Sequence, residues 1–446
     1  MKGPLISAAV LVFILLSAAS WAADSPSPKE RTRQTLLYGI DSQVLEAIQG
    51  LTAARDTGYT EQLLQILREQ RSTAVQKAVL DMFRDLKQKD GEGRAKEILA
   101  AGSDSPSELL VSAVKYLSAI DSAGLAPALA PLVDSSDSAV ASAAIEALGR
   151  VGDSSSAALL AEKLKSGDFP DAHRSEAILA LGAMKNPAAV DALLAIAKNT
   201  DEDKIRRMYA ADSLGKIGDA RALPVLRDMF AEKDALIRLY AASAVARFSM
   251  SEAFPLLLQG LRDESWNVRE MSAKTLARQL DGGQAGQAVP ILSYKAEWDP
   301  VPQVRLASIQ ALGEIGGSEA DSALLSLYSG PSRPPETREA ALGALAAHSP
   351  SAAIDAARGT VAAGTRSVDQ LTLLATARVI STLKDGQLKE IYLKLLENPD
   401  PIVRSYAVRG IAENHFADLR ERLKQIADSD PNAATRAEAA KGLSKL

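Results

Sequence analysis

The sequence predicts an all-α fold, an α-solenoid of about thirteen stacked two-helix repeats, and its composition is the first reason. Alanine occurs 79 times among the 446 residues, whereas aromatic residues make up only 4 %. Alanine is the best helix former and lets helices approach one another closely. A large mixed core would need more aromatic side chains to bury comparable area. Runs of alternating β-branched residues are also missing, which disfavours a sheet.

The second reason is a repeat of about 32 residues, clearest in 205–219 (IRRMYAADSLGKIGD) and 304–316 (VRLASIQALGEIG). With Arg207 and Arg305 as reference positions, small or apolar residues follow three, four, seven and eight residues later. These offsets form one stripe of a helix with 3.6 residues per turn. The same frame places reference positions at Val44, Gln76, Leu110, Ala141, Arg174, Arg207, Arg238, Arg269, Arg305, Arg338, Thr372, Arg404 and Arg436.

Each unit contains two helices by the same reasoning. A second amphipathic run precedes each reference helix, for example 188–197 (AAVDALLAIA), and turn residues such as the Gly–Asp pair at 218–219 separate the two runs. A lone helix pair cannot bury its apolar faces, whereas stacked pairs can. The frame fills residues 35–446 and predicts a single solenoid without a separate domain.

The pattern V-R-x-x-A-x-x-A-L-G-x-I-G-D carries a family resemblance. It is strong at 140–153, 205–219 and 304–316 and weak near the N-terminus. It resembles the short bacterial HEAT-like repeats, the type also found in phycobilin lyase subunits. The resemblance implies a right-handed α-solenoid, and it implies a shared scaffold, not a shared reaction.

The N-terminus predicts export. Lys2 precedes an apolar run over 5–19, and the small residues Ser20 and Ala22 place signal peptide cleavage between Ala22 and Ala23. We therefore expect a signal peptide over 1–22, a flexible leader over 23–34 and a periplasmic or secreted mature chain. The alternative is an uncleaved membrane anchor, which usually needs about 20 apolar residues. Because the chain has no cysteine, a lipoprotein and a disulfide-bonded fold are excluded.

The sequence offers little for catalysis or for nucleic acid. A formal charge of −5 disfavours nucleic-acid binding. His173, His348 and His415 lie at unequal offsets, and no His–Glu dipeptide is present, unlike in metal-dependent enzymes of the deoxyhypusine hydroxylase type. We expect these histidines at surface or capping positions. We expect no catalytic residues, no metal site and no cofactor.

Arginine occupies the reference position in most of the later repeats, and an acidic residue precedes it. The acidic residues are Asp171, Asp203, Asp234, Asp263, Asp299, Glu336, Asp400 and Asp430. This ladder could bind anions. The interpretation we favour is structural, since an aspartate at a helix start accepts from free backbone N–H groups and a guanidinium one repeat along can pair with it.

One row of residues indicates a binding surface. Offsets 2, 5, 6 and 9 of the second helix fall opposite the apolar stripe, and second helices usually line the concave side of HEAT solenoids. Three successive repeats carry large side chains at offset 2 and basic side chains at offset 9. These are Tyr209, Tyr240 and Met271, and Lys216, Arg247 and Arg278. Aromatic, methionine and arginine side chains are typical of interface centres. The alternative is that the tyrosines pack on neighbouring helices.

A longer step of 36 residues separates Arg269 from Arg305 and contains Tyr294 and Trp298. It predicts either a functional loop or, as we prefer, a bend in the superhelix. Taken together, the sequence predicts an exported, non-enzymatic scaffold that binds a protein or peptide along the concave face. A subunit of a lyase-like complex and a structural spacer in the cell envelope are the alternatives.

Overall fold

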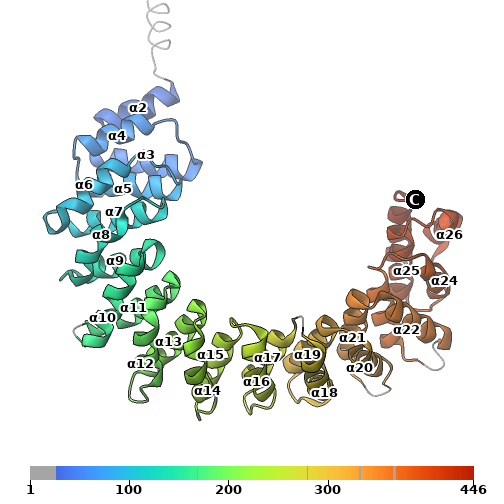
Figure 1. The fold of residues 1–446 in the computed structure, drawn as a ribbon. Helices are drawn as coiled ribbons and strands as arrows, with labels where there is room; N and C mark the ends of the chain where they lie inside the picture. Colours follow the sequence, from blue (N-terminus) through green and yellow to red (C-terminus); the bar gives the residue numbers. More distant parts are fainter. Residues whose placement is uncertain (1–26, 168, 279, 331–332, 365–367) are drawn as a thin grey trace, which may run out of the picture. The chain divides into compact units, whose positions relative to one another are not determined.

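A computed structural model describes residues 27–446 except 168, 279, 331–332 and 365–367. The described residues form α-helices and short 3₁₀ helices, and none of them lies in a strand. The chain divides into two compact units, residues 1–217 and 218–446. In each unit, helices alternate along the chain between two layers (Figure 1).

Unit 1 contains six helix pairs among its described residues. The first helices are α2 (Pro28–Tyr38), α4 (Thr60–Arg68), α6 (Glu92–Ala101), α8 (Leu125–Leu129), α10 (Ser154–Ser166) and α12 (Val190–Lys198). The second helices are α3 (Asp41–Ala54), α5 (Thr73–Asp85), α7 (Ser107–Ala119), α9 (Ser138–Val151), α11 (Asp171–Met184) and α13 (Lys204–Ile217). Three 3₁₀ helices complete it: η1 (Gly102–Asp104), η2 (Ala130–Asp134) and η3 (Pro187–Ala189).

Unit 2 contains seven helix pairs among its described residues. The first helices are α14 (Leu223–Phe230), α16 (Met250–Gly260), α18 (Gly282–Trp298), α20 (Ser318–Ser329), α22 (Pro350–Ala363), α24 (Lys389–Leu395) and α26 (Arg420–Ser429). The second helices are α15 (Ala235–Val245), α17 (Trp266–Leu276), α19 (Pro302–Ile315), α21 (Pro335–His348), α23 (Gln370–Ile380), α25 (Pro401–Glu413) and α27 (Ala433–Leu443). The 3₁₀ helices are η4 (Ala220–Ala222), η5 (Gly386–Leu388) and η6 (Ala417–Leu419).

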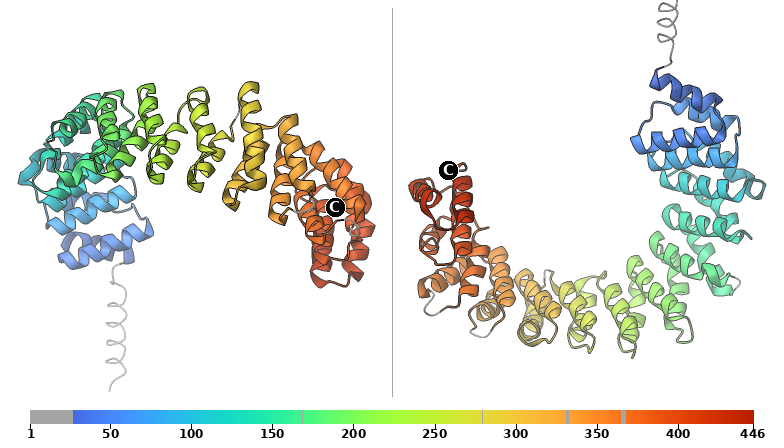
Figure 2. Two further views of the ribbon diagram at one scale, coloured as in Figure 1. Left: turned by 90° about the horizontal axis from the view of Figure 1, so that it is seen from below. Right: turned by 180° about the vertical axis from the view of Figure 1, so that it is seen from behind.

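The described helices thus make thirteen pairs, and every reference position of the sequence repeat lies on a second helix. The all-helical solenoid predicted from the sequence is confirmed. Within each unit, a second helix packs on its own first helix and on the second helix of the next repeat (Figure 2).

The first repeat begins earlier than the sequence indicated. Residues 28–34, expected to belong to a flexible leader, form the start of α2, and Leu36 on the same helix is fully buried. Ser27 caps this helix by accepting from the N–H of Glu30, and Pro28 follows at its first position, where a missing N–H has no cost. The expected signal peptide and its cleavage site lie outside the described residues.

Small residues let neighbouring second helices approach closely. A Cβ added to Gly149 would lie 2.9 Å from the Cα of Ala180, and one added to Gly182 would lie 2.8 Å from the Cα of Ser213. Both glycines stand at offset 8 of their repeats. The Leu–Gly pair of the repeat is therefore a packing requirement between α9, α11 and α13.

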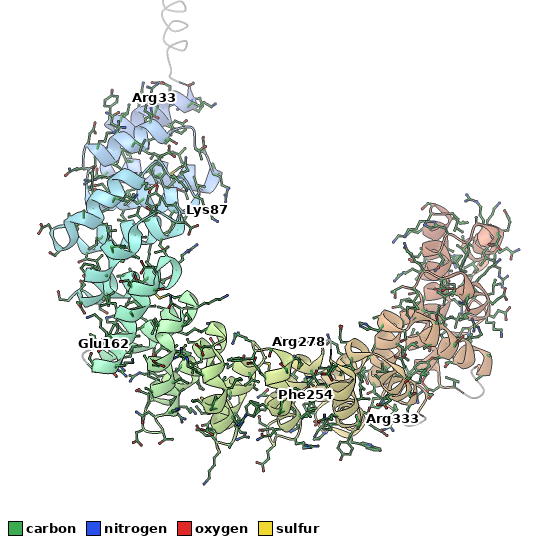
Figure 3. All side chains as sticks on the ribbon, viewed as in Figure 1. Arg33, Lys87, Glu162, Phe254, Arg278 and Arg333 are labelled. Carbon is green, nitrogen blue, oxygen red and sulfur yellow. The ribbon has the colours of Figure 1, made fainter. Side chains whose placement is uncertain are left out.

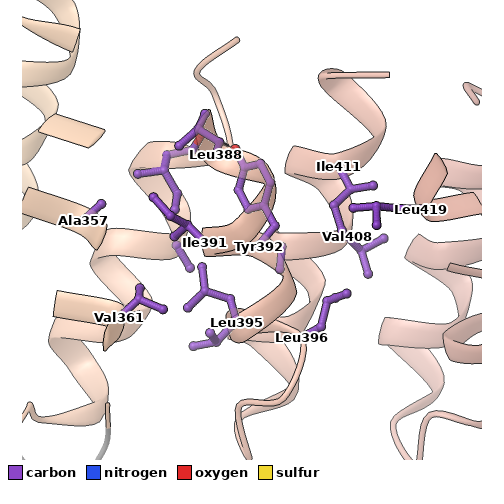
Figure 4. Close-up of a cluster of buried hydrophobic side chains, with 14 of the residues drawn as sticks. Ala357, Val361, Leu388, Ile391, Tyr392, Leu395, Leu396, Val408, Ile411 and Leu419 are labelled. Atoms are coloured by element: carbon purple, nitrogen blue, oxygen red, sulfur yellow. Dashed lines mark hydrogen bonds between the residues drawn. The ribbon is translucent and has the colours of Figure 1, made fainter. Parts of the chain in front are cut away.

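Larger side chains fill the space between the two layers. In the last repeats, Leu388, Ile391 and Tyr392 pack with Val408 and Ile411 in one buried cluster (Figure 4). The Tyr392 hydroxyl donates to the carbonyl of Ile380 at 2.6 Å, so this buried phenol keeps a partner.

The structure separates the two roles expected for the acidic residues. Aspartates four residues before a reference arginine cap the second helix: Asp203, Asp234 and Asp400 accept from its first N–H groups. Aspartates six residues before it bind the arginine of the preceding repeat through two oxygens. These pairs are Arg238–Asp263, Arg269–Asp299 and Arg404–Asp430, at 2.7–2.8 Å. The structural interpretation of the ladder is confirmed at these positions.

The 36-residue step is not a loop. The additional residues lengthen a first helix instead, because α18 has 17 residues whereas α16 has 11 and α20 has 12. Tyr294 and Trp298 lie one turn apart near the end of this helix, and both are exposed. Gly282 and Gly283 lie in the first turn of α18, after the cap residue Asp281. The bend in the superhelix stays a prediction.

Candidate functional site on the second-helix face

The exposed strip of the second helices is narrower than the sequence predicted. At offset 6, Ser213, Ala244 and Thr275 are buried, although the helical wheel placed this offset outward. At offset 2, Tyr209 and Tyr240 are half-buried. The reason is that a second helix is covered by its own first helix and also by the neighbouring second helices of the same unit.

Four of the six predicted binding residues lie in unit 2 at matching offsets on α15 and α17, which pack together. Tyr240 and Met271 are half-buried, whereas Arg247 and Arg278, just beyond the ends of the helices, are exposed. Figure 3 shows Arg278 on the side of the second helices, with Phe254 of α16 in the other layer.

The sequence reasoning missed two exposed apolar side chains on these helices. Leu236 on α15 is 45 % exposed and Trp266 on α17 is 40 % exposed. Leu236 precedes Tyr240 by one helical turn, so the two share a face. Trp266 is five positions before Met271, about 140° around the helix, so these two lie on different sides of α17. We call Leu236, Tyr240 and Met271 the apolar row of unit 2.

The remaining two predicted residues, Tyr209 and Lys216, lie on α13 in unit 1. Lys216 is half-buried and pairs with Asp212 one turn earlier, with Nζ 2.8 Å from the carboxylate. Its charge is therefore already compensated, in contrast to the exposed guanidinium of Arg278. The six predicted residues therefore divide between the two units. The four in unit 2 lie on, or just after, α15 and α17, which pack together.

Unit 1 carries two connected grooves on its second helices. The first, which we call the basic groove, has a volume of about 320 Å³ and is lined by Arg84 of α5, Lys115 of α7, and Glu146 and Arg150 of α9. The second, the apolar groove, has about 560 Å³ and is lined by Glu176, Leu179, Ala180 and Ala183 of α11 and by residues of α9. Both are lined by Glu146 and Arg150, so they run into one another across α5, α7, α9 and α11.

The floor of these grooves follows from the repeat sequence. Ala143 and Ala147 line the basic groove, and Gly149 and Ala180 line the apolar groove. Side chains this small fill little of the space above the helix crossing, so a hollow remains between the longer side chains on either side. The sequence alone does not predict these grooves, because their position depends on the register between neighbouring helices.

His173 is buried between α9 and α11, contrary to the expected surface or capping position. It is 5 % exposed, and its Nδ1 lies 2.9 Å from the carboxylate of Glu176. Ser142 donates to the same carboxylate at 3.0 Å, and the Ser138 hydroxyl lies 3.4 Å from Nε2. This cluster joins the two helices. His348 is the last residue of α21, and its Nε2 lies 3.6 Å from the carboxylate of Glu314. His415 is exposed.

Within the described part of the chain, no three His, Cys, Asp or Glu side chains gather in a way that could hold a metal ion. Over the same residues, no helix combines the length and the apolar content needed to cross a bilayer.

The paired helices, the two layers and the repeat-to-repeat ladder define an α-solenoid of two-helix repeats. A family model described as spirochaete HEAT repeat protein matches residues 36–442, so the chain belongs to this family. The resemblance to HEAT repeats is thereby confirmed, and the phycobilin-lyase subtype stays a prediction. None of the curated proteins compared with the chain matches it.

Solved structures share the fold at low sequence identity. Importin beta is 13 % identical with a TM-score of 0.53, and the match covers 93 % of this chain and 66 % of importin beta. Kap121p bound to Ste12p is 14 % identical with a TM-score of 0.54, covering 93 % of this chain and 52 % of Kap121p. Kap121p bound to the extreme C-terminus of the phosphatase Cdc14p is 14 % identical with a TM-score of 0.51, covering 93 % and 53 %. The chain therefore spans between half and two thirds of these larger solenoids.

Proposed function

We propose that this protein is an exported, non-enzymatic scaffold that binds a protein or peptide along its second-helix face. The observation that carries the proposal is the apolar row of unit 2 beside the exposed cations Arg247 and Arg278. Large apolar side chains left to solvent next to arginine have the composition of interface hot spots. Neither a metal site nor a cofactor is part of the proposal.

The repeated architecture suits an extended partner. Each second helix offers only a few side chains to solvent, so one repeat alone would bind weakly. A partner that crosses several repeats adds these small contacts, and the linked contacts act as one binding event. HEAT solenoids in general serve as scaffolds, and two of the similar solenoid structures contain bound protein segments, of Ste12p and of Cdc14p.

Export is part of the same proposal. We infer that residues 1–22 are removed between Ala22 and Ala23 and that the mature chain is periplasmic or secreted, without a membrane anchor. The support is the order of Lys2, the apolar run and the small residues before the expected cut. An acidic chain with a formal charge of −5 is also a poor candidate for nucleic-acid binding.

The proposal is tested by photocrosslinking in the cells that make the protein. A photoreactive amino acid replaces Leu236, and the crosslinked partners are identified by mass spectrometry. The double variant Tyr240→Ala with Arg247→Glu should reduce the recovery of the same partner about tenfold or more, because it removes a central apolar contact and reverses a charge.

The matched control is Tyr294→Ala with Arg227→Glu, at exposed positions on the first helices α18 and α14, which should leave the partner's recovery unchanged. Circular dichroism should show equal helicity in all variants. Unchanged recovery with the double variant would remove the apolar row from the binding site. If no partner crosslinks reproducibly and concave substitutions are tolerated while deletion of one repeat is not, the chain is a spacer.

A further inference from the structure

Two of the three cations that line the basic groove of unit 1 form no ion pair with any of the described residues. These are Lys115 of α7 and Arg150 of α9, and both are exposed. Arg84 of α5 lines the same groove and is held in place by Asp81 at 2.7 Å and Asp85 at 2.9 Å. Three cations from three successive repeats thus converge, and Glu146 is the one carboxylate that lines the groove with them.

The neighbouring surfaces differ in character on the two sides. Beyond α9, the basic groove opens into the apolar groove, where Leu179 is 36 % exposed. On the other side, between α3 and α5, a groove of about 560 Å³ is lined by Asp81, Asp85 and Glu108 together with Lys77. A negatively charged group is therefore favoured between α5 and α9. Leu45, Ile48 and Met82 also line the α3–α5 groove, but its three carboxylates disfavour an acidic segment there, which leaves α11 as the place for an apolar group beside the acidic ones.

From this order we infer that unit 1 binds an extended segment of a partner protein in which acidic side chains are followed by an apolar one. The inference deepens the proposed function and rests on it. Carboxylates of the segment pair with Lys115 and Arg150, and its apolar side chain enters the groove beside Leu179. Arg150, which lines both grooves, aligns the two contacts.

The spacing of the segment follows from the spacing of the repeats. Neighbouring packed helices lie roughly 8–10 Å apart. A segment in the polyproline II conformation advances about 3.1 Å per residue with three residues per turn, so every third side chain points to the same side. Every third residue of such a segment therefore meets the next second helix. The expected pattern is an acidic residue, an acidic residue three positions later and a leucine or similar residue three positions after that.

Fluorescence anisotropy with a labelled synthetic peptide tests the inference on the full mature chain. The probe carries Asp, Asp and Leu at every third position in a Gly–Ser background, and a matched peptide carries Lys in place of both Asp residues. We expect the acidic probe to bind at least about tenfold more tightly than the basic one, with an affinity that falls as salt rises.

The protein variants separate the groove from general charge. Lys115→Glu with Arg150→Glu should weaken the acidic probe about tenfold or more. Arg68→Glu with Lys198→Glu, at exposed positions on the first helices α4 and α12 of the same unit, changes the net charge equally and should leave binding unchanged. Leu179→Ala should weaken the probe but have no effect on a peptide whose Leu is replaced by Ser.

Three outcomes would overturn the inference: equal loss with both charge-reversed pairs, no loss with either, or equal binding of the acidic and basic probes. Selection of a random peptide library against the same chain distinguishes failure of this inference from failure of the proposed function. Selected peptides that depend on Tyr240 but lack acidic residues would sink the inference and leave the scaffold proposal standing. A library without binders, together with an absence of crosslinked partners, would contradict both.

Discussion

The two units of this protein have the same repeat but tie their repeats together differently. In unit 2, buried arginines reach the next repeat and bind its aspartate through two oxygens, as Arg269 does with Asp299, which is 2 % exposed. In the first four repeats of unit 1 the equivalent positions are Val44, Gln76, Leu110 and Ala141, all buried.

In unit 1, hydroxyl groups form some of the ties between repeats. The Tyr116 hydroxyl donates to the carbonyl of Gln88 at 2.8 Å, and the Ser213 hydroxyl to that of Ile178 at 2.9 Å. Ser112 donates to the carboxylate of Asp81 at 2.7 Å.

Ion pairs form other ties in unit 1, such as Arg71–Asp41 at 2.8 Å and Arg174–Glu202 at 3.3 Å. The comparison teaches that the stacking of helix pairs, which both units share, defines this fold, and that the polar tie between repeats is exchangeable.

The largest expected effect is the loss of a buried ion pair in unit 2. Arg269→Met leaves the Asp299 carboxylate buried and should cost about 3–5 kcal/mol. Hydrogen exchange of α17 and α19, with α5 and α7 of unit 1 as an internal reference, measures where the protection is lost. The double variant Arg269→Met with Asp299→Leu should recover part of the loss, because the buried carboxylate is removed as well. Lys295, 3.5 Å from that carboxylate, then loses its ion-pair partner.

A contrary result would change the comparison. If Arg269→Met costs no more than Arg305→Met, the paired carboxylate contributes nothing special, since Arg305 donates to the backbone carbonyls of Asp299 and Pro300. The buried pairs of unit 2 would then be equivalent to the hydroxyl ties of unit 1.

Acid should weaken unit 2 through the same pairs, with a smaller effect per pair because a protonated carboxyl still accepts a hydrogen bond. Burial alone would raise the pKa of Asp299, but the hydrogen bonds from Arg269 and from the N–H of Val301 hold the pKa below its ordinary 3.8. The Arg404 hydrogen bond likewise lowers the pKa of Asp430. A lowered pKa in the folded chain stabilises above the unfolded pKa, and this stability is lost as pH falls through the folded value.

We therefore expect α17–α19 and α25–α27 to lose protection below about pH 4, with full protection above it. Hydrogen exchange between pH 2.5 and 5, corrected for the intrinsic exchange rate, measures the loss. In the double variant Arg269→Met with Asp299→Leu, the acid-dependent part of the loss should disappear from α17 and α19. Its persistence there would assign the acid sensitivity to other carboxylates.

The smallest expected effect concerns the feature that both units share. Gly182→Ala in unit 1 would place a Cβ 2.8 Å from the backbone of Ser213, and Gly313→Ala in unit 2, also at offset 8, would place one 2.9 Å from the Cβ of Ala344. Each should cost about 1–3 kcal/mol by overpacking. Thermal or denaturant unfolding measures the loss of stability in each variant, and hydrogen exchange shows in which helices protection is lost.

Helical glycines with free space provide the control. A Cβ added to Gly50 on α3 or to Gly343 on α21 meets nothing within 4 Å. Alanine there should stabilise by about 0.5–1 kcal/mol, because it lowers the entropy lost on folding. If all four variants behave alike, close helix approach is not what the repeated glycine provides.

The sequence predicted most of the fold because the fold is local. The helix stripe at offsets 3, 4, 7 and 8, the turn residues and the step of about 32 residues repeat often enough to fix the pairs, and all reference positions lie on second helices. It missed the start of α2 at Pro28 and the length of α18. At both places the chain lacks the repeat pattern, and helix caps decide the boundaries.

The candidate site was predicted less completely. Tyr240 and Met271 lie on α15 and α17, and Arg247 and Arg278 follow the ends of these helices, but the exposed Leu236 and Trp266 were missed. Lys216 pairs with Asp212, which a wheel drawn for one offset at a time does not reveal. The helical wheel treats a helix as having two faces, whereas a second helix packs on its first helix and also on second helices of its unit.

The sequence by itself determined the helix pairs, their number and the side of each helix that is buried, because hydrophobic periodicity and capping act within about 30 residues. Only the tertiary structure decided which arginine binds which aspartate, that His173 is buried, and that grooves cross α5 to α11. These features depend on the register between neighbouring helices. That register is set by side-chain packing across repeats, as at Gly149 against Ala180, and no single repeat contains it.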